Sequence, residues 1–430
     1  MLDIQLFRER PDVVRDNLRR RGMDPSPVDE VVDLDRRWRQ ARKQLDELRA
    51  RRNKASVEVA NAKKQGGDGS SLIQEMQRAA KEMEGLERQS ADFEAQRNAL
   101  LWRLPNLMHD SVPVGKDDSQ NVPIKTVGEP RKHGFSPKSH VDLLASLDIA
   151  DIDRAAKTAG ARFFYLKNEG VLLSMAIQRF AIDVLSRKGW TPIDPPYLLR
   201  RDAIAGATSL GDFEDVIFKV EGEDLNLIAT SEHAIGAMHA DEIFDDKQLP
   251  IRYAGVSPCF RKEAGAHGKD TKGIFRVRQF HKVEMFIFCK PEESWPLHGE
   301  LLQNAEELVA ALGVPYRVVN ICTGDLGSVA AKKYDIEAWM PVQNAYRELV
   351  SCSNCTDYQA RRYATRTRAS TQEPTRFVHT LNSTALAVER TIVAILENFQ
   401  RADGSVAIPA PLHPYMNGIT ELRPKGGSLN

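Results

Sequence analysis

A seven-residue hydrophobic repeat limits what the N-terminal quarter of the chain can fold into. Between residues 31 and 48, and again between residues 76 and 100, apolar side chains recur at spacings of three, four or seven. They are Val31, Leu34, Trp38, Ala41, Leu45 and Leu48, then Met76, Ala79, Met83, Leu86, Phe93 and Leu100. This spacing is typical of a coiled-coil seam, and a glycine-rich turn at residues 66–71 separates the two runs. The pattern predicts a long antiparallel pair of helices, each of about 35 residues and roughly 50 Å in length.

The outer face of the first predicted helix is rich in basic side chains. They are Arg36, Arg37, Arg39, Arg42, Lys43, Arg49, Arg51, Arg52, Lys54, Lys63 and Lys64, and the nearby acids are Asp33, Asp35, Asp46, Glu47 and Glu58. A solvated coiled-coil surface is one interpretation of this composition. Because bases outnumber acids, we favour a second interpretation, a positively charged probe for a nucleic-acid backbone.

The overall composition restricts the partners and the compartment. Lys plus Arg and Asp plus Glu both total 60 among 430 residues, so the chain has no net charge, and a nucleic-acid partner must be recognised by a local patch. Five cysteines in this length do not indicate a disulfide scaffold and favour a reducing compartment. No apolar run reaches the roughly 18 residues of a membrane span, and the N-terminus resembles neither a signal nor a transit peptide. We therefore expect a cytoplasmic protein with no membrane partner.

Changes in composition along the chain predict three segments. Residues 1–104 should form the helical arm. Residues 105–140 contain proline, glycine and charged residues without periodicity, which indicates a linker. Residues 141–430 should form a mixed α/β (α+β) body.

Within this body, hydrophobic patterns predict helices at residues 170–188, 292–312 and 381–399. A strand predicted at 191–198 contains three prolines. Proline cannot donate to a ladder, so this strand should lie at the edge of a sheet. Edge strands of this kind are common at subunit contacts, which favours a homodimer.

The stretch from Cys259 to Phe286 is predicted to form a strand, a polar loop and a second strand. Arg261 and Glu263 are two apart, so both side chains should leave one face of the first strand. The same argument groups four side chains on the second strand: Arg276, Arg278, Phe280 and Glu284. A cross-strand ion pair and ordinary core packing would also explain these residues. The loop at residues 264–273 carries glycines and cationic side chains, which favours a nucleotide site with an arginine on phosphate and an aromatic ring on the base.

Two further clusters have oxygen-bearing side chains. Residues 230–232, Thr-Ser-Glu, are a helix start signal and also a suitable place to bind a small zwitterion. Glu348 and Ser351 could ligate Mg²⁺ through oxygen. Cys352 and Cys355 form a C-x-x-C pair, but structural zinc requires four ligands and the sequence contains no second pair, so we expect no zinc.

An arginine follows a run of small residues late in the chain. Arg390 comes after H-T-L-N-S-T-A-L-A-V-E and should lie near the start of the last helix. It is either an ordinary surface arginine or a second clamp on a triphosphate, opposite Arg261. The second interpretation requires that these two residues meet in one pocket.

Together these segments resemble the three motifs of class II aminoacyl-tRNA synthetases. The motifs are an interface helix and strand ending in proline, a strand–loop–strand with F-R-x-E, and a strand and helix with a late arginine. They are similar to residues 170–196, 260–286 and 381–390. T-S-E at 230–232 and S-C-S-N-C-T-D-Y-Q-A-R-R from Ser351 resemble seryl-tRNA synthetases in particular. Over essentially its whole length, the chain is identified as a member of that family.

The resemblance implies a fold and a set of roles. The fold is an antiparallel β-sheet flanked by helices and preceded by a coiled-coil hairpin that binds tRNA. Arg261 and Arg390 would be the catalytic residues, on the α- and γ-phosphates. The implied ATP-binding residues are Arg261, Glu263, Arg276, Val277, Phe280, Glu348, Ser351 and Arg390, with Glu348 and Ser351 holding Mg²⁺.

The resemblance also implies a serine pocket. Its residues would be Thr230, Ser231, Glu232, Arg261, Glu284, Asn382 and Thr384, with Glu284 on the serine ammonium group and Thr384 on the hydroxyl. Many relatives have N-G-S-G where this chain has N-S-T-A at 382–385. A residue that is often glycine in the family is Glu389 here.

The function implied is ATP-dependent attachment of L-serine to tRNA(Ser) through a seryl-adenylate, by a homodimer that uses ATP and Mg²⁺. Whether tRNA(Sec) is a second partner stays open. One alternative is a synthetase-like ligase that charges a carrier protein. Another is a non-catalytic coiled-coil adaptor.

Overall fold

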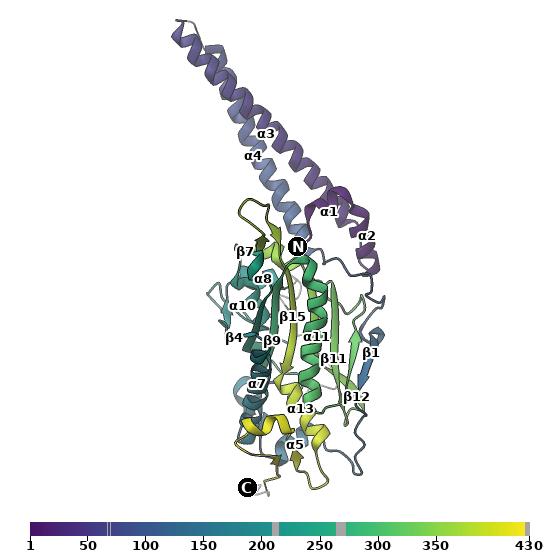
Figure 1. Ribbon diagram of the computed structural model, residues 1–430. Helices are drawn as coiled ribbons and strands as arrows, with labels where there is room; N and C mark the ends of the chain where they lie inside the picture. Colours follow the sequence, from purple (N-terminus) through teal and green to yellow (C-terminus); the bar gives the residue numbers. More distant parts are fainter. Residues whose placement is uncertain (67, 69, 209–214, 264–271, 426–430) are drawn as a thin grey trace. The chain divides into compact units, whose positions relative to one another are not determined.

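The computed structural model of the chain describes residues 1–66, 68, 70–208, 215–263 and 272–425 (Figure 1). The chain divides into two compact units, Met1–Leu107 and Met108–Asn430.

Helices are the only regular secondary structure in the described part of the first unit. Its helices are α1 Ile4–Glu9, α2 Pro11–Arg20, α3 Pro27–Lys64 and α4 Ser70–Arg103. Helices α3 and α4 lie side by side (Figure 1), with Leu45, Leu48 and Met83 buried between them. The predicted hairpin is therefore confirmed, and its helices have 38 and 34 residues.

The base of the hairpin contains a buried ionic cluster that the apolar repeat did not reveal. Asp35, counted above among the acids of the outer face, is only 1% exposed. It accepts from Nε of Arg8 at 2.8 Å, Nε of Arg39 at 3.0 Å and Nη1 of Arg97 at 3.0 Å. The Arg97 guanidinium also lies 4.7 Å from the ring centre of Trp38. One carboxylate thus joins α1, α3 and α4.

The second unit is built on an eight-stranded sheet. In spatial order its strands are β1 Val122–Val127, β10 Tyr316–Asn320, β11 Lys332–Met340, β12 Ala345–Thr356, β15 His379–Ala387, β9 Gln279–Cys289, β8 Ile251–Phe260 and β4 Thr191–Ile193. All neighbours are antiparallel except β4 and β8. This antiparallel sheet confirms the predicted fold class.

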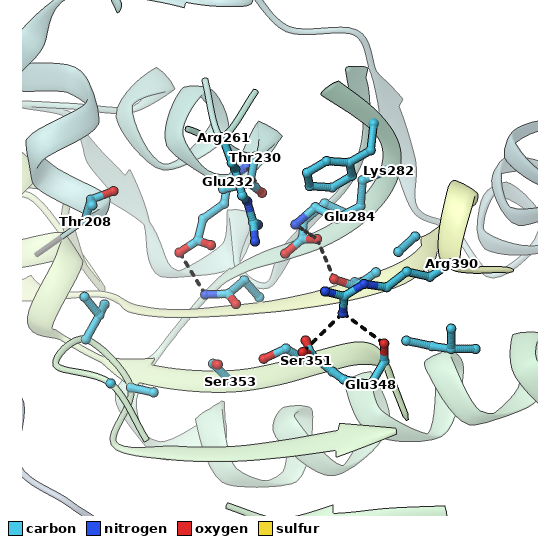
Figure 2. A pocket seen from close by; sticks show the side chains of 18 of the residues that line it. Thr208, Thr230, Glu232, Arg261, Lys282, Glu284, Glu348, Ser351, Ser353 and Arg390 are labelled. Carbon is cyan, nitrogen blue, oxygen red and sulfur yellow. Dashed lines mark hydrogen bonds and ion pairs between the residues drawn. The ribbon is translucent and has the colours of Figure 1, made fainter. Parts of the chain in front are cut away.

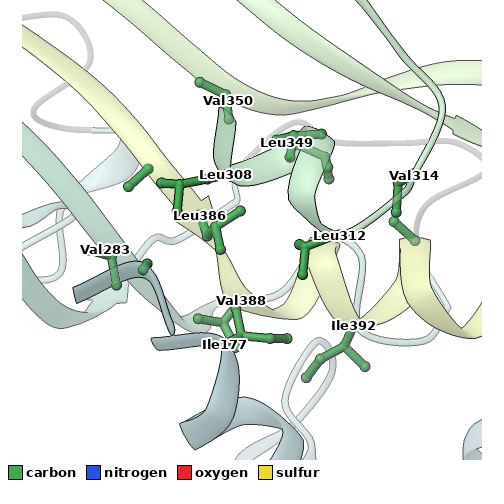
Figure 3. Close-up of a cluster of buried hydrophobic side chains, with 14 of the residues drawn as sticks. Ile177, Val283, Leu308, Leu312, Val314, Leu349, Val350, Leu386, Val388 and Ile392 are labelled. Atoms are coloured by element: carbon green, nitrogen blue, oxygen red, sulfur yellow. The ribbon is translucent and has the colours of Figure 1, made fainter. Parts of the chain in front are cut away.

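Three helices cover one face of this sheet: α7 Glu169–Arg187, α11 Ser294–Ala311 and α13 Val388–Phe399. Side chains alternate along a strand, so one side of each central strand joins a single apolar core under these helices. Figure 3 shows part of this core, with contributions from every layer: Ile177, Val283, Leu308, Leu312, Val350, Leu386, Val388 and Ile392. The opposite side of β9, β12 and β15 is available for polar residues.

Shorter elements surround the sheet. Further α-helices in the described part of the chain include α5 His140–Ser146, α6 Ile152–Ala159, α8 Arg201–Ala207, α10 Ser231–Met238 and α12 Tyr358–Tyr363. The remaining strands are β2 Ala150–Asp151, β3 Tyr165–Leu166, β5 Leu198–Leu199, β6 Asn226–Leu227, β7 Ile243–Asp245, β13 Arg366–Arg368, β14 Arg376–Phe377, β16 Val406–Ala407 and β17 Glu421–Leu422. Within the described ranges, no helix is long and apolar enough to cross a membrane.

Several predicted elements differ from the structure. The helix predicted at 381–399 is wrong in its first part, because residues 379–387 form β15, which pairs with β9 on one side and β12 on the other. Pairing on both sides outweighs the local composition of small residues. The strand predicted at 191–198 ends at Ile193, before the next two prolines, but it does lie at the sheet edge. Residues 105–140, predicted as a linker, contribute β1 to the opposite edge.

Candidate functional site

A pocket opens on the polar side of β9, β12 and β15, on the side opposite the apolar core (Figure 2). It is lined by residues from these three strands, from the segments that follow β8 and precede β9, and from the starts of α10 and α13. Predicted site residues that line it are Thr230, Glu232, Arg261, Glu263, Arg276, Val277, Phe280, Glu284, Glu348, Ser351, Asn382, Thr384 and Arg390. Ser231 does not join them, because its side chain is fully buried against Gly255 of β8.

Strand β9 contributes three alternating side chains to the pocket: Phe280, Lys282 and Glu284. The Nζ atom of Lys282 lies 2.6 Å from Oε2 of Glu284, and the Thr384 hydroxyl donates to the same oxygen at 3.2 Å. Sequence reasoning paired Glu284 with arginines or an ammonium ligand and overlooked Lys282. The alternation itself could have identified Lys282, since it lies between two residues already assigned to that face.

Two β-bulges direct side chains of the neighbouring strands into the pocket. Glu348 and Ser351 are three apart, so on a regular strand they would face opposite sides. The pairing of β11 with β12 shifts by one residue at Leu349, which returns both side chains to one face. A second shift in β15, after Thr384, has the same effect on Ala387.

The segment after β8 reaches the pocket in a different way from the one predicted. Strand β8 ends at Phe260, so the argument from alternation at Arg261 and Glu263 does not apply. Arg261 instead donates from Nε to the Ala229 carbonyl at 3.3 Å, and its guanidinium lies 5.1 Å from the Phe280 ring centre. Glu263 forms an ion pair with Arg276.

The other end of the pocket is formed by Arg390 on the first turn of α13. Its Nη1 atom lies 3.2 Å from Oε2 of Glu348 and donates to the Glu348 carbonyl at 2.9 Å. Its guanidinium lies 5.0 Å from the ring centre of Phe275, a lining residue that sequence reasoning missed. Partial removal from water opposes the charge on Glu348, but the positive charges of Arg390 and Lys333 outweigh this and lower its pKa.

The start of α10 places a carboxylate at the end of the pocket near Arg261 (Figure 2). Thr230 caps the helix by accepting from the Glu232 backbone N–H at 3.2 Å, as the start signal predicted. The Glu232 side chain accepts from Asn382 at 3.0 Å and from Gln359 at 2.7 Å. Burial raises the pKa of Glu232 to about 7, and the nearby charge of Glu284 adds to this rise.

The cysteine pair and the polar loop are the last two sequence features to locate in the structure. Among the described residues, no group of three or more His, Cys, Asp or Glu side chains is arranged to hold a metal ion. Cys352 belongs to the apolar core, whereas Cys355 lines the pocket, so the two thiols do not face one site. Most of the loop predicted to cover the nucleotide, residues 264–271, lies outside the described residues.

An antiparallel sheet beneath one pocket, lined by Arg261, Arg390 and several carboxylates, is the arrangement expected of the catalytic core of a class II aminoacyl-tRNA synthetase. The comparisons with known proteins agree. Residues 216–399 match the class II core domain of the G, H, P, S and T tRNA synthetases, and residues 1–108 match the seryl-tRNA synthetase N-terminal domain.

Similar proteins extend over the full chain. The serine–tRNA ligase of Thermococcus sibiricus is 52% identical, with 99% of this chain and 98% of that protein covered. The crystal structure of Pyrococcus horikoshii seryl-tRNA synthetase with ATP has a TM-score of 0.95 at 52% identity, covering 99% and 100% of the two chains. The Naegleria fowleri cytoplasmic enzyme with AMP has a TM-score of 0.90 at 36% identity, covering 99% of each chain. The chain belongs to the seryl-tRNA synthetase family, which confirms the resemblance, and it is an enzyme that attaches serine to tRNA(Ser).

Proposed function

We propose that this pocket binds ATP and serine together, forms seryl-adenylate, and passes the seryl group to the terminal ribose of tRNA. The observation that carries the proposal is that Arg261 and Arg390, 129 positions apart in the sequence, line one pocket. The relatives crystallised with ATP and AMP support a nucleotide there. In the first step a serine carboxylate oxygen attacks the α-phosphorus and pyrophosphate leaves.

The residues of this chain supply position and charge rather than a covalent nucleophile. Arg261, near the serine end, would hold the α-phosphate and stabilise the charge that develops on it, and Arg390 would hold the γ-phosphate. Phe280 would stack on adenine, and Glu263 and the Val277 backbone would form hydrogen bonds with the edge of the adenine ring. Because Arg261 and Arg390 line the same pocket, they would keep the triphosphate in line with the serine carboxylate.

The donor set near Arg390 suits Mg²⁺. Glu348 and Ser351 offer a carboxylate and a hydroxyl oxygen, the hard ligands that this ion prefers, and Arg390 keeps Glu348 ionised. Two protein ligands are enough for an ion that takes its other ligands from ATP phosphates and water. When bound, the ion would neutralise phosphate charge during pyrophosphate release.

We place serine at the other end of the pocket. Glu284 would bind its ammonium group in exchange for part of the contact with Lys282, and Thr384 would bind its hydroxyl. Glu232 and Thr230 would complete the pocket wall. A buried site that pairs with a hydroxyl rejects an analogue without it by roughly 10⁴–10⁵, so alanine should be excluded.

The helical unit is proposed to bind tRNA through the exposed bases of α3. Arg36 and Arg37 form ion pairs with Asp33 along the helix, so these two charges are partly neutralised. Further exposed bases of α3 include Arg42, Lys43, Arg51 and Arg52. These would contact the phosphate backbone.

A homodimer is proposed because exposed apolar side chains occur near the edge strand of the sheet. Strand β4 lies at that edge, and apolar side chains nearby in the sequence are exposed: Val171 and Met175 on α7, and Leu198 on β5. Light scattering on Met175→Asp should show a monomer, while Val342→Asp, at an exposed turn between β11 and β12, should leave the dimer intact.

All five cysteines are free thiols, which suits a cytoplasmic location.

Serine-dependent ATP–pyrophosphate exchange and tRNA charging test the proposal together. The proposed enzyme exchanges pyrophosphate only with serine and charges tRNA(Ser). A ligase for a carrier protein would show exchange without charging, and an adaptor would show neither. The same charging assay with tRNA(Sec) tests the second partner.

A further inference from the structure

A short chain of hydrogen bonds lies behind the serine end of the pocket. Gln359 of α12 and Thr380 of β15 are both fully buried, and neither is among the described residues that line the pocket. The Thr380 hydroxyl donates to Oε1 of Gln359 at 2.6 Å, and Nε2 of Gln359 donates to Oε1 of Glu232 at 2.7 Å. Asn382 donates to the same Glu232 oxygen at 3.0 Å. Two neutral amides therefore hold one oxygen of this carboxyl group.

Strand β15 aligns this chain with the pocket. Thr380, Asn382 and Thr384 alternate on one face of the strand. Thr380 reaches Gln359, Asn382 reaches Glu232, and Thr384 reaches Glu284. The strand that supplies pocket residues thus also supplies the support behind them.

When Glu232 is ionised, its hydrogen bond selects one orientation of the Gln359 amide. Its oxygen can only accept and therefore meets the Thr380 hydroxyl, while its NH₂ group can only donate and meets Glu232. A rotated amide would place its oxygen against the Glu232 carboxyl group, where ionised oxygens offer no donor. Thr380 stabilises the observed orientation by donating to the Gln359 oxygen, which keeps the NH₂ group on the side of Glu232.

We propose that Gln359, oriented by Thr380, is a positioning residue that holds the Glu232 carboxyl group in place for serine recognition. The inference rests on the proposed function, because it assumes that Glu232 belongs to the serine end of the pocket. The ATP end, with Arg390 and Glu348, lies outside this chain of hydrogen bonds. Losing the support should therefore weaken serine recognition and leave ATP recognition nearly unchanged.

The proton equilibrium of Glu232 gives a second measurable consequence. The charged and titratable groups that act on it come from several elements: Glu284 and Lys282 on β9, Arg261 after β8, and Cys355 and Tyr363 on β12 and α12. Burial and Glu284 raise the pKa of Glu232, while the hydrogen bond from Gln359 lowers it. Without that bond, the pH at which serine recognition changes should move upward.

The test uses the full-length enzyme and measures KM for serine, KM for ATP and kcat by pyrophosphate exchange. Gln359→Leu keeps the size of the side chain and removes the amide. We expect KM for serine to rise about 10- to 100-fold, the range for losing a hydrogen bond to a charged group, with KM for ATP within about twofold of wild type. Thr380→Val should raise KM for serine less than Gln359→Leu does. Thr380→Ser keeps the hydroxyl and should have a KM for serine close to that of wild type. Gln303→Leu, which removes an exposed amide on α11, is the matched control.

The outcomes separate the inference from the proposed function. If wild-type enzyme shows no serine-dependent exchange, the proposed function fails. If wild type is active while Gln359→Leu and Thr380→Val leave KM for serine and its pH profile unchanged, the positioning role is wrong. A variant that only unfolds would lower kcat without moving either KM. Should Gln359→Leu fail to fold, the milder Thr380→Val and Thr380→Ser pair decides the question.

Discussion

Two carboxyl groups that are removed from water, one in each unit, are held in opposite ways. Asp35, at the base of the hairpin, receives hydrogen bonds from three arginines. Burial alone would raise its pKa, but the hydrogen bonds and charges of Arg8 and Arg39 outweigh burial and lower it. Glu232, in the pocket, receives neutral amides, and its pKa rises to about 7.

The difference separates a structural carboxylate from one suited to binding. A buried charge whose counter-charges come from its own chain is satisfied before any ligand arrives. A carboxyl group whose hydrogen bonds come from neutral amides, and whose pKa is raised, still has electrostatic energy to gain from a positively charged ligand. An amino acid with an ammonium group is such a ligand.

The largest expected effect concerns the pocket. Arg261→Ala should lower serine-dependent exchange by about 10²- to 10³-fold, the loss typical of removing one donor that stabilises transition-state charge. Stability should change little, since the guanidinium serves the substrate. The control is Arg401→Ala, which removes an exposed arginine paired with Glu421. Normal exchange by Arg261→Ala would refute the catalytic role.

The opposite result is expected at the hairpin base. Asp35→Ala should lower the free energy of unfolding of the helical unit by about 3 kcal/mol, because it leaves buried Arg97 with only the half-exposed Glu94 carboxylate, at 3.5 Å, as its counter-charge. Exchange with serine should be unaffected. Asp33→Ala, which removes the partner of the exposed Arg36 and Arg37, should cost much less, because solvent screens these ion pairs. Equal losses in urea titrations of the two variants would contradict the structural role of Asp35.

The two carboxyl groups should also affect stability with opposite dependence on pH. The folded-state pKa of Glu232 lies above its unfolded value, so its ionisation destabilises the fold progressively as pH rises from about 4.5 to 7. Glu232→Gln should therefore stabilise the protein by up to about 3 kcal/mol at pH 8 and hardly at all at pH 4, while serine activation is lost. The pKa of Asp35 is lowered, so its contribution is present above the unfolded pKa and is lost as pH falls below it. Thermal unfolding from pH 2 to 8 measures both; a Glu232→Gln variant that is destabilised at pH 8 would contradict this interpretation.

The smallest effect should come from exposed charges of the arm. The double change Arg51→Ala and Arg52→Ala should raise KM for tRNA and reduce the slope of log K against log salt by about two, one for each phosphate contact. Exchange without tRNA should not change. Arg36→Ala, whose charge is already paired with Asp33, is the control. An unchanged salt slope would place the tRNA contact elsewhere.

Elements that depend on a local sequence pattern were predicted correctly. The spacing of Val31 to Leu48 indicated the hairpin, and the prolines after Thr191 indicated an edge strand, because each depends on local geometry. The Asp35 cluster was not predicted, because a charged residue in an apolar seam can be recognised only when its partners on other helices are known.

The site was predicted by residue type better than by geometry. Alternation correctly grouped Phe280 with Glu284 inside β9, but it was wrong for Arg261 and Glu263, which lie beyond the end of β8. The bulge at Leu349 brings Glu348 and Ser351 to one face, and no local sequence signal marks it. Gln359 was missed because it acts from behind the pocket.

The account depends most on one triphosphate lying between two arginines. A crystal structure of the enzyme with serine and a non-hydrolysable ATP analogue tests this directly. We expect the α-phosphate beside Arg261, the γ-phosphate beside Arg390, and the serine ammonium group near Glu284 and Glu232. A nucleotide bound outside this pocket, or one that contacts only one of the two arginines, would contradict the proposed mechanism.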